Sequence, residues 1–201
     1  MLQTICNYLS NQLISTNIIT KEEQIIYNYG IYLILMTIIT SGTILISGVF
    51  LEKIILTIIF LFVLVSMRHY AGGYHANAYW KCYLLSCLSY YITMYFTFNV
   101  KLQRKMVLLV LMVIVMLYNI KIGSLNSDKN PKTEKEMIIR KKRARYLFLL
   151  YGVISIIGIL FDIAEITIWL VMVWGQVIVM IALLSQQINR RYLRWKLKRQ
   201  Y

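Results

Sequence analysis

Residues 54–67, "IILTIIFLFVLVSM", form a run of 14 residues without a charge, and Arg68 follows directly. A run this apolar on every side predicts a helix surrounded by lipid rather than by water. A helix rises about 1.5 Å per residue, and roughly 20 residues are needed to cross a typical hydrocarbon core. This run is therefore too short to cross the core by itself. We expect the long side chain of Arg68 and local thinning of the bilayer to make up the difference.

Five further apolar segments repeat this pattern along the chain. They cover residues 26–51, 83–100, 106–120, 146–161 and 166–185. Hydrophobic residues make up 59% of the 201, which is more than the polar surface of a soluble domain allows. The sequence therefore predicts one all-α integral-membrane domain over residues 1–201. This polytopic protein has about six short helices, with four full spans plus re-entrant or interfacial pieces as the alternative.

The N-terminal residues 1–20 predict a different kind of helix. Their apolar side chains recur at helical spacing, with polar side chains opposite them, at Leu2, Ile5, Cys6, Leu9 and Leu13. This pattern is typical of an amphipathic helix lying on a membrane surface. No basic residue precedes Lys21, so no cleavable signal peptide is expected. The following "TKEE" predicts a capping box between Thr20 and Glu23 at the start of the first span.

The basic residues predict the orientation. With six spans and a cytoplasmic N-terminus, segments 1–25, 68–82, 121–145 and 186–201 lie inside and carry 18 Lys or Arg residues. The short outside links carry 4. This positive-inside bias places both termini and residues 68–82 in the cytoplasm, where thiols stay reduced. No disulfide is therefore expected from the three cysteines.

Most of the net charge of +14 lies in two segments, the predicted basic cytoplasmic loop 121–145 and the basic tail 186–201. The charges lie in blocks between apolar runs, beside Trp and Tyr, which favours a membrane surface and argues against nucleic acid. Anionic membrane lipids alone account for such charges. The loop is equally suited to docking an acidic peptide, and the two interpretations are compatible.

Residues 68–82, "RHYAGGYHANAYWKC", contain the candidate catalytic side chains. They contain both histidines of the chain and Cys82. Histidine, with an ordinary pKa of roughly 6.5, can accept the proton of a thiol and return it later. We take Cys82 as the candidate nucleophile and His75 as its base. Cys87 lies further into an apolar run and is expected to be a packing residue.

The spacing of His75 and Cys82 requires a break in the helix. Seven residues apart in one continuous helix, the two side chains lie roughly 10 Å apart, too far for proton transfer. Gly72 and Gly73 permit a turn, and Asn77 is a suitable N-cap for a helix that starts at residue 78. Residues 74–76 can then fold back toward the thiol.

No carboxylate is expected to orient the imidazole. Glu52, Asp162 and Glu165 fall on the opposite membrane face in this topology, so the site is a Cys–His dyad rather than a triad. A metal site of both histidines and Cys82 lacks a fourth ligand, and no cofactor is expected. Arg68 could grip a substrate carboxylate or carbonyl, but from spacing alone it is expected to mark the membrane boundary.

The pattern of Arg68, Gly72-Gly73, His75 and Cys82 resembles the AgrB family (accessory gene regulator protein B). The chain length, the short spans and the basic segment in the second half agree with that resemblance. The family consists of membrane cysteine endopeptidases of Gram-positive quorum-sensing systems. The resemblance implies a multi-pass protein of the cell membrane and a precursor partner, AgrD, with an acidic tail.

The resemblance also implies a reaction. Cys82 would cleave the precursor at the C-terminal side of the future ring and hold it as a thioester. A side chain of the precursor would then close a thiolactone or lactone autoinducing peptide. His75 would be the base, while Arg68 and Gly73 match further motif positions, with substrate contact and backbone geometry as suggested roles.

One alternative from another class is a non-catalytic small membrane protein, such as a transporter subunit or a peptide-export helper. It predicts charged or polar side chains at mid-membrane depth, where substrate paths are built. The apolar runs contain Asn99 and Gln176 but no buried charge, which argues modestly against it. Pairing of two copies into a homodimer stays open.

Overall fold

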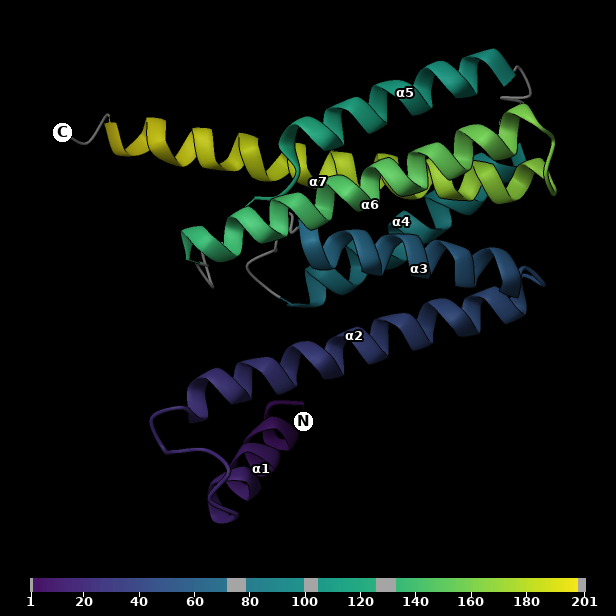
Figure 1. Ribbon diagram of the computed structural model, residues 1–201. Helices are drawn as coiled ribbons and strands as arrows, with labels where there is room; N and C mark the ends of the chain where they lie inside the picture. The colour runs from purple at the N-terminus through teal and green to yellow at the C-terminus, as the bar shows by residue number, and fades with distance from the viewer. Residues whose placement is uncertain (1, 72–78, 100–104, 126–132, 199–201) are drawn as a thin grey trace.

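The computed structural model describes residues 2–71, 79–99, 105–125 and 133–198, and all regular secondary structure in them is helical. The helices are α1 (Leu2–Ser15), α2 (Gln24–Phe50), α3 (Ile54–Ala71), α4 (Tyr79–Asn99), α5 (Lys105–Ile122), α6 (Glu134–Leu160) and α7 (Ile166–Lys198). Figure 1 shows α3 to α7 gathered in a bundle, with α2 along one side and α1 beside the start of α2. The predicted all-α class is confirmed.

Four of the described helices are long and apolar enough to cross a membrane. They are α2, α3, α6 and residues Ile166–Asn189 of α7. The apolar part of α5, Met106–Ile122, is shorter. Helix α4 carries five tyrosines along its length and is not among the helices that are apolar enough to span. The lengths therefore agree with the alternative of four full spans plus shorter pieces.

The N-terminal region contains the predicted helix and the predicted contacts between Thr20 and Glu23, but Glu23 rather than Thr20 is the N-cap of α2, so the span begins later than predicted. Helix α1 buries Cys6 and Ser10 and packs along α2. The Thr20 backbone N–H donates to the Glu23 carboxylate at 3.0 Å, and the Glu23 N–H donates to the Thr20 hydroxyl at 3.3 Å. The first of these hydrogen bonds is the main cause that holds the pKa of the Glu23 carboxyl below its usual value. The chain thus turns at Thr20 just before α2 begins.

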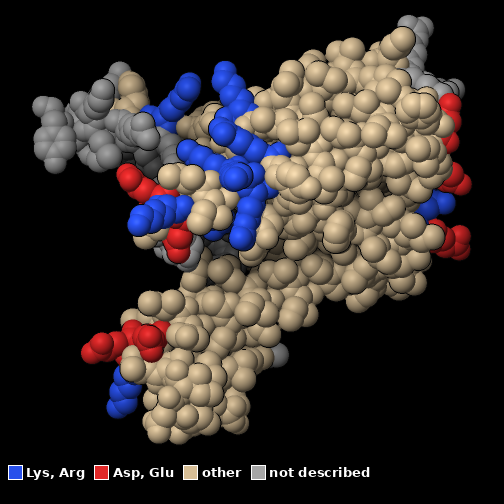
Figure 2. Space-filling view, viewed as in Figure 1, with Lys and Arg blue, Asp and Glu red and all other residues tan. Residues whose placement is uncertain are grey.

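Charged residues separate to the two ends of the bundle. Figure 2 shows Lys and Arg side chains gathered at the end where α6 begins, and a few charges of both signs at the opposite end. Those at the opposite end belong to the short α2–α3 and α6–α7 connections, which contain Glu52, Lys53, Asp162 and Glu165. The sides thus differ in charge as the sequence predicts, and we call the Lys/Arg-rich end the basic end.

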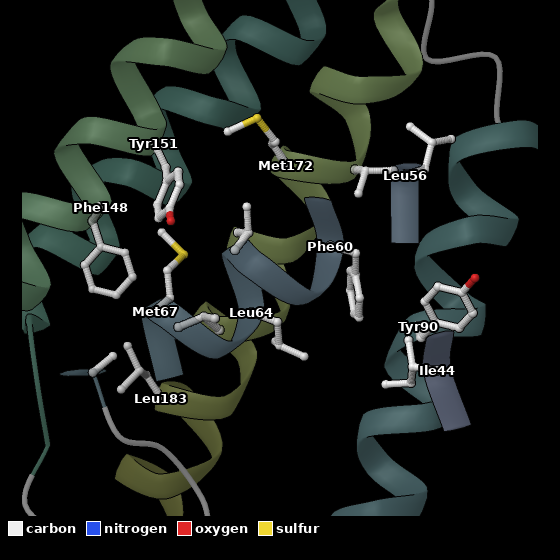
Figure 3. Packing of buried hydrophobic residues seen from close by; sticks show 14 of the residues in the cluster. Ile44, Leu56, Phe60, Leu64, Met67, Tyr90, Phe148, Tyr151, Met172 and Leu183 are labelled. Carbon is white, nitrogen blue, oxygen red and sulfur yellow. The ribbon is translucent and has the colours of Figure 1, made fainter. Parts of the chain in front are cut away.

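Helix α3 is the centre of the core. Its buried residues recur every three or four positions, at Leu56, Phe60, Val63, Met67 and Ala71, among others. This face packs against α6 and α7, while α2 covers another side. Figure 3 shows Phe60 next to Tyr90, with ring centroids 5.5 Å apart, and Met67 on the side of α3 toward Phe148 and Tyr151. Because lipid is as apolar as the core, close packing rather than transfer from water holds these helices together.

A polar contact and a glycine bring α2, α3 and α4 together. The Thr57 hydroxyl donates to the Lys53 carbonyl at 2.9 Å and lies 2.8 Å from the Tyr90 hydroxyl, from which it can accept. Gly48 of α2 lies directly against this threonine, and a Cβ built there would be 2.3 Å from the Thr57 hydroxyl oxygen. The close approach of α2 to α3 therefore depends on the absence of a side chain at residue 48.

Replacing Gly48 with alanine is expected to destabilise the protein by about 1–3 kcal/mol, because the new methyl group displaces Thr57 and breaks its contact with Tyr90. Gly42→Ala is the matched control, since it makes the same change on the same helix with nothing within 4 Å. It is expected to be neutral or slightly stabilising. Unfolding midpoints in detergent compare the two variants, and equal midpoints would contradict the packing argument.

The basic segment 121–145 requires a correction. It was expected as a loop, but α5 extends to Ile122 and α6 begins at Glu134, so the dense basic run from Arg140 to Arg145 is helical. Thr133 caps α6 through a capping box with Glu136. Lys, Arg and Glu are good helix formers. A helix that is capped at Thr133 can therefore include the basic run before the apolar span begins. The basic side chains are thus arranged along a helix.

Candidate active site

The candidate site lies at the basic end, where α3 ends and α4 begins. Arg68 and His69 belong to the last turn of α3, and Cys82 is the fourth residue of α4. Figure 1 shows these two helix ends at the same end of the bundle. Arg68 and Cys82 are half-buried and His69 is exposed. The fold thus brings Arg68 and Cys82 to one end from two different helices.

The three cysteines have different surroundings. All are free thiols. Cys6 is fully buried, and Cys87 packs against the main core cluster. Cys82 is half-buried and is not part of either core cluster. The prediction that Cys87 is a packing residue is confirmed, whereas Cys82 lies outside both core clusters.

The residues predicted to bring the base to the thiol are Gly72, Gly73, His75 and Asn77, and all four lie outside the described residues. The approach of His75 to Cys82 therefore stays a prediction. The described helices α3 and α4 run in opposite directions (Figure 1). Helix α4 is described from Tyr79, which places Cys82 at the end of its first turn.

Helix α6 holds the end of α3 that carries Arg68. The Arg140 guanidinium donates to the His69 carbonyl at 2.6 Å, and the Arg143 guanidinium lies 5.9 Å from the centre of the Tyr70 ring. The last carbonyls of a helix have no partner within it, and a cationic donor satisfies them well. The final turn of α3 is therefore fixed by the basic run of α6.

The same basic run holds the end of α5 and the segment that follows it. Arg145 Nε donates to the Ile120 carbonyl at 3.0 Å. Gly123, in the left-handed region at φ 67°, lies under the Arg145 side chain. Two residues later, the Leu125 N–H donates to the Ala71 carbonyl at 3.0 Å. The C-terminal ends of α3 and α5 are thus joined to each other and to α6.

Sequence reasoning missed these roles of Arg140 and Arg145. The density of basic residues was visible, but Arg140 and His69 are 71 positions apart. No pattern in one sequence indicates which carbonyl a distant arginine will meet. The nearest available signal was "TEKE" at residues 133–136, which has the spacing of a capping box and would have predicted the helix.

Acidic side chains are distributed largely as expected. Glu52 and Asp162 lie in the connections at the end opposite Cys82, and Glu165 directly precedes α7 there. At the basic end, Glu136 already accepts from the Thr133 N–H in the capping box.

These features define a class: a polytopic, all-α integral membrane protein with a half-buried free thiol at its basic end. Residues 2–183 match the family model described as Accessory gene regulator B, and the chain belongs to this AgrB family. It is therefore a membrane protein of the accessory gene regulator system. Membership associates it with the processing of autoinducer peptides and with an AgrD-type precursor.

Two relatives from Clostridium perfringens agree with this assignment. The chain is 26% identical over 169 residues to "Putative AgrB-like protein 2" of strain 13 (Type A), and 25% identical over 169 residues to "Putative AgrB-like protein" of strain SM101 (Type A). Each alignment covers 80% of this chain and 78% of the relative. No solved structure matches the chain.

Proposed function

We propose that this chain is a membrane cysteine endopeptidase that cleaves an AgrD-like precursor through a thioester on Cys82 and allows the acyl group to cyclise. One observation carries the proposal. Of the three cysteines, Cys82 alone is neither fully buried nor packed on a core cluster, and it lies in the first turn of α4 at the basic end. A thiol so placed is accessible from the membrane surface, where an amphipathic peptide would arrive.

The first half of the reaction forms an acyl-enzyme. His75 takes the proton of the Cys82 thiol, and the sulfur attacks the carbonyl carbon at the C-terminal side of the future ring. The C–N bond breaks, and His75 returns the proton to the leaving amine. The precursor's acidic tail departs, and the remaining peptide stays on Cys82 as a thioester.

The second half closes the ring without a further reagent. A thiol or hydroxyl within the bound peptide attacks the thioester carbonyl, the C–S bond breaks, and Cys82 regains its proton. A thioester keeps enough acyl-transfer reactivity for this step. The product is a thiolactone or lactone, depending on the side chain that attacks.

The other motif residues have supporting roles in this proposal. Arg68 contacts the substrate from the last turn of α3, which Arg140 and Leu125 hold in place. Gly72 and Gly73 allow the turn that returns His75 toward the thiol, and Asn77 caps the helix that carries Cys82. Backbone N–H groups of the first turn of α4, which lack partners within the helix, are available to a developing oxyanion.

The proposed orientation has both termini and the site in the cytoplasm of a Gram-positive cell, with anionic lipids at the basic end. The separation of charge between the two ends supports it.

Trapping the acyl-enzyme tests the proposal. The protein in liposomes is mixed with its precursor, which we expect to be encoded next to it, and quenched with acid. Mass spectrometry is expected to find the N-terminal fragment of the precursor on Cys82, and hydroxylamine, which cleaves thioesters, is expected to remove it. Cleavage that proceeds with no such adduct, or an adduct on Cys87 instead, would overturn the assignment.

A further inference from the structure

A groove of about 590 Å³ opens at the basic end between α3 and α6. Tyr70 lines it from α3, and six residues line it from α6: Ile138, Ile139, Lys142, Arg143, Tyr146 and Leu147. Sites for small ligands and short peptide segments commonly have a volume in this range, about 300–1,000 Å³. Tyr70 belongs to the segment 68–82 and is two residues beyond Arg68, so the groove begins at the end of α3 that carries Arg68.

Apolar and basic side chains alternate in pairs along the face of α6 that lines the groove. Its residues lie on one helix face, where apolar side chains come first, two cations follow, and apolar side chains come again. The apolar side chains are far from buried: Ile138 is 67% exposed, Ile139 51% and Tyr146 67%. In a protein whose other exposed apolar faces meet lipid, the position of Ile138 and Ile139 beyond the cations needs its own explanation.

That position distinguishes a peptide from a lipid. Ile138 and Ile139 lie on the far side of Lys142 from the apolar span of α6, which runs toward Leu160. A phospholipid places its acyl chains on one side of its phosphate only, so it would leave this isoleucine pair uncovered. A peptide with an acidic residue between two apolar residues covers both sides.

The spacing fits an extended chain. Ile138, Lys142 and Tyr146 are four residues apart in turn, which is about 6 Å along the helix axis for each step. In an extended peptide, side chains on one face are two residues apart and separated by about 6.6 Å. A segment with the pattern apolar, any residue, acidic, any residue, apolar therefore matches the groove step for step.

We propose that this groove is the docking site for an acidic, apolar segment of the peptide substrate, bound extended along α6. Its carboxylate meets Lys142 and Arg143, and its apolar side chains cover Ile138 on one side and Tyr146 on the other. The Arg143 side chain is already positioned by the Tyr70 ring. It therefore loses little side-chain entropy when it binds a carboxylate. The proposal rests on the proposed endopeptidase function, because the docked segment belongs to that enzyme's substrate.

A charge swap tests the docking site by binding rather than by cleavage. The Cys82→Ala protein is placed in nanodiscs of zwitterionic phosphatidylcholine and titrated with a fluorescent peptide that repeats Leu-Ser-Glu-Ser, which presents Leu and Glu in turn on one face of an extended chain. The variant Lys142→Glu/Arg143→Glu is expected to bind this peptide roughly tenfold or more weakly. It is expected to gain binding to the matching Leu–Lys peptide. This gain also shows that the variant is folded.

Lys135→Glu is the matched control, because Lys135 is exposed on the same helix and does not line the groove. It is expected to bind the Leu–Glu peptide almost as the parent does. Equal losses in the two variants would indicate a general charge effect and overturn the proposal. Unchanged peptide binding together with lost binding of phosphatidylglycerol would instead assign the groove to lipid.

The two proposals fail in different ways. If Cys82 forms no acyl-enzyme but the charge swap holds, the groove stands as a peptide site and the endopeptidase function falls. If the adduct forms and Lys142→Glu/Arg143→Glu leaves the KM for the precursor unchanged, the function stands and the docking site falls.

Discussion

Cys82→Ala is expected to abolish cleavage of the co-expressed precursor, with a loss of roughly 10⁴-fold or more, the order seen when a covalent catalyst loses its nucleophile. The loss should come without unfolding. Cys82 is half-buried in the first turn of α4 and belongs to neither core cluster, so truncation leaves no cavity in the core. Immunoblots that follow both the precursor and the membrane-inserted enzyme measure the two effects together.

Cys87→Ala is the matched control on the same helix. Cys87 packs against the core cluster, so its truncation is expected to lower the unfolding midpoint modestly and to leave cleavage intact. The two cysteines thus separate in opposite directions, one in activity and the other in stability. Cleavage that survives in Cys82→Ala and is lost in Cys87→Ala would identify Cys87 as the nucleophile and refute the proposed site.

The apolar part of each membrane helix could be predicted because the bilayer imposes a length on apolar runs. Residues 54–67 predicted a helix, and α3 occupies Ile54–Ala71. The four added residues include Arg68, which shows that the helix does not end where the apolar run ends. The limit of an apolar run marks the lipid boundary, whereas the end of a helix depends on caps and on tertiary partners such as Arg140.

The contacts between helices could not be predicted in the same way. Gly48 had no distinguishing pattern, yet a side chain there would strike Thr57 of the next helix. The same applies to Arg145, whose carbonyl partner lies 25 positions earlier. Such contacts depend on the rotation and crossing of helices, and lipid-facing and buried faces are similarly apolar in a membrane protein.

The candidate site was predicted in part. Local sequence was sufficient to predict that Cys87 packs against the core, because Cys87 lies deeper within an apolar run than Cys82 does. The basic segment was assigned to the correct end but with the wrong secondary structure, because its high charge predicted a loop whereas the capping box at Thr133 starts a helix. The pairing of His75 with Cys82 still rests on the spacing argument and on the family pattern.

His75→Ala is expected to lower the rate of cleavage by about 10²–10⁴-fold, the usual contribution of a general base. The precursor should still bind, so the loss is expected in kcat with little change in KM. His69→Ala is the matched control, because these are the two histidines of the chain and only six positions separate His69 from His75. His69 is exposed on the last turn of α3, and its carbonyl rather than its ring contacts Arg140, so its truncation should leave most of the activity.

Added imidazole tests whether His75 acts by proton transfer. If His75 acts by moving a proton, free imidazole in solution should restore part of the activity of His75→Ala and none of that of Cys82→Ala.

Labelling with a maleimide probe measures the reactivity of each thiol without substrate. Cys82 should react faster than Cys87 in the parent, and should lose that advantage in His75→Ala but keep it in His69→Ala. If both histidine variants lose the advantage equally, the segment acts through its fold and not through one base. If only His69→Ala loses it, the base is His69, and the break between α3 and α4 serves another purpose than returning His75 to the thiol.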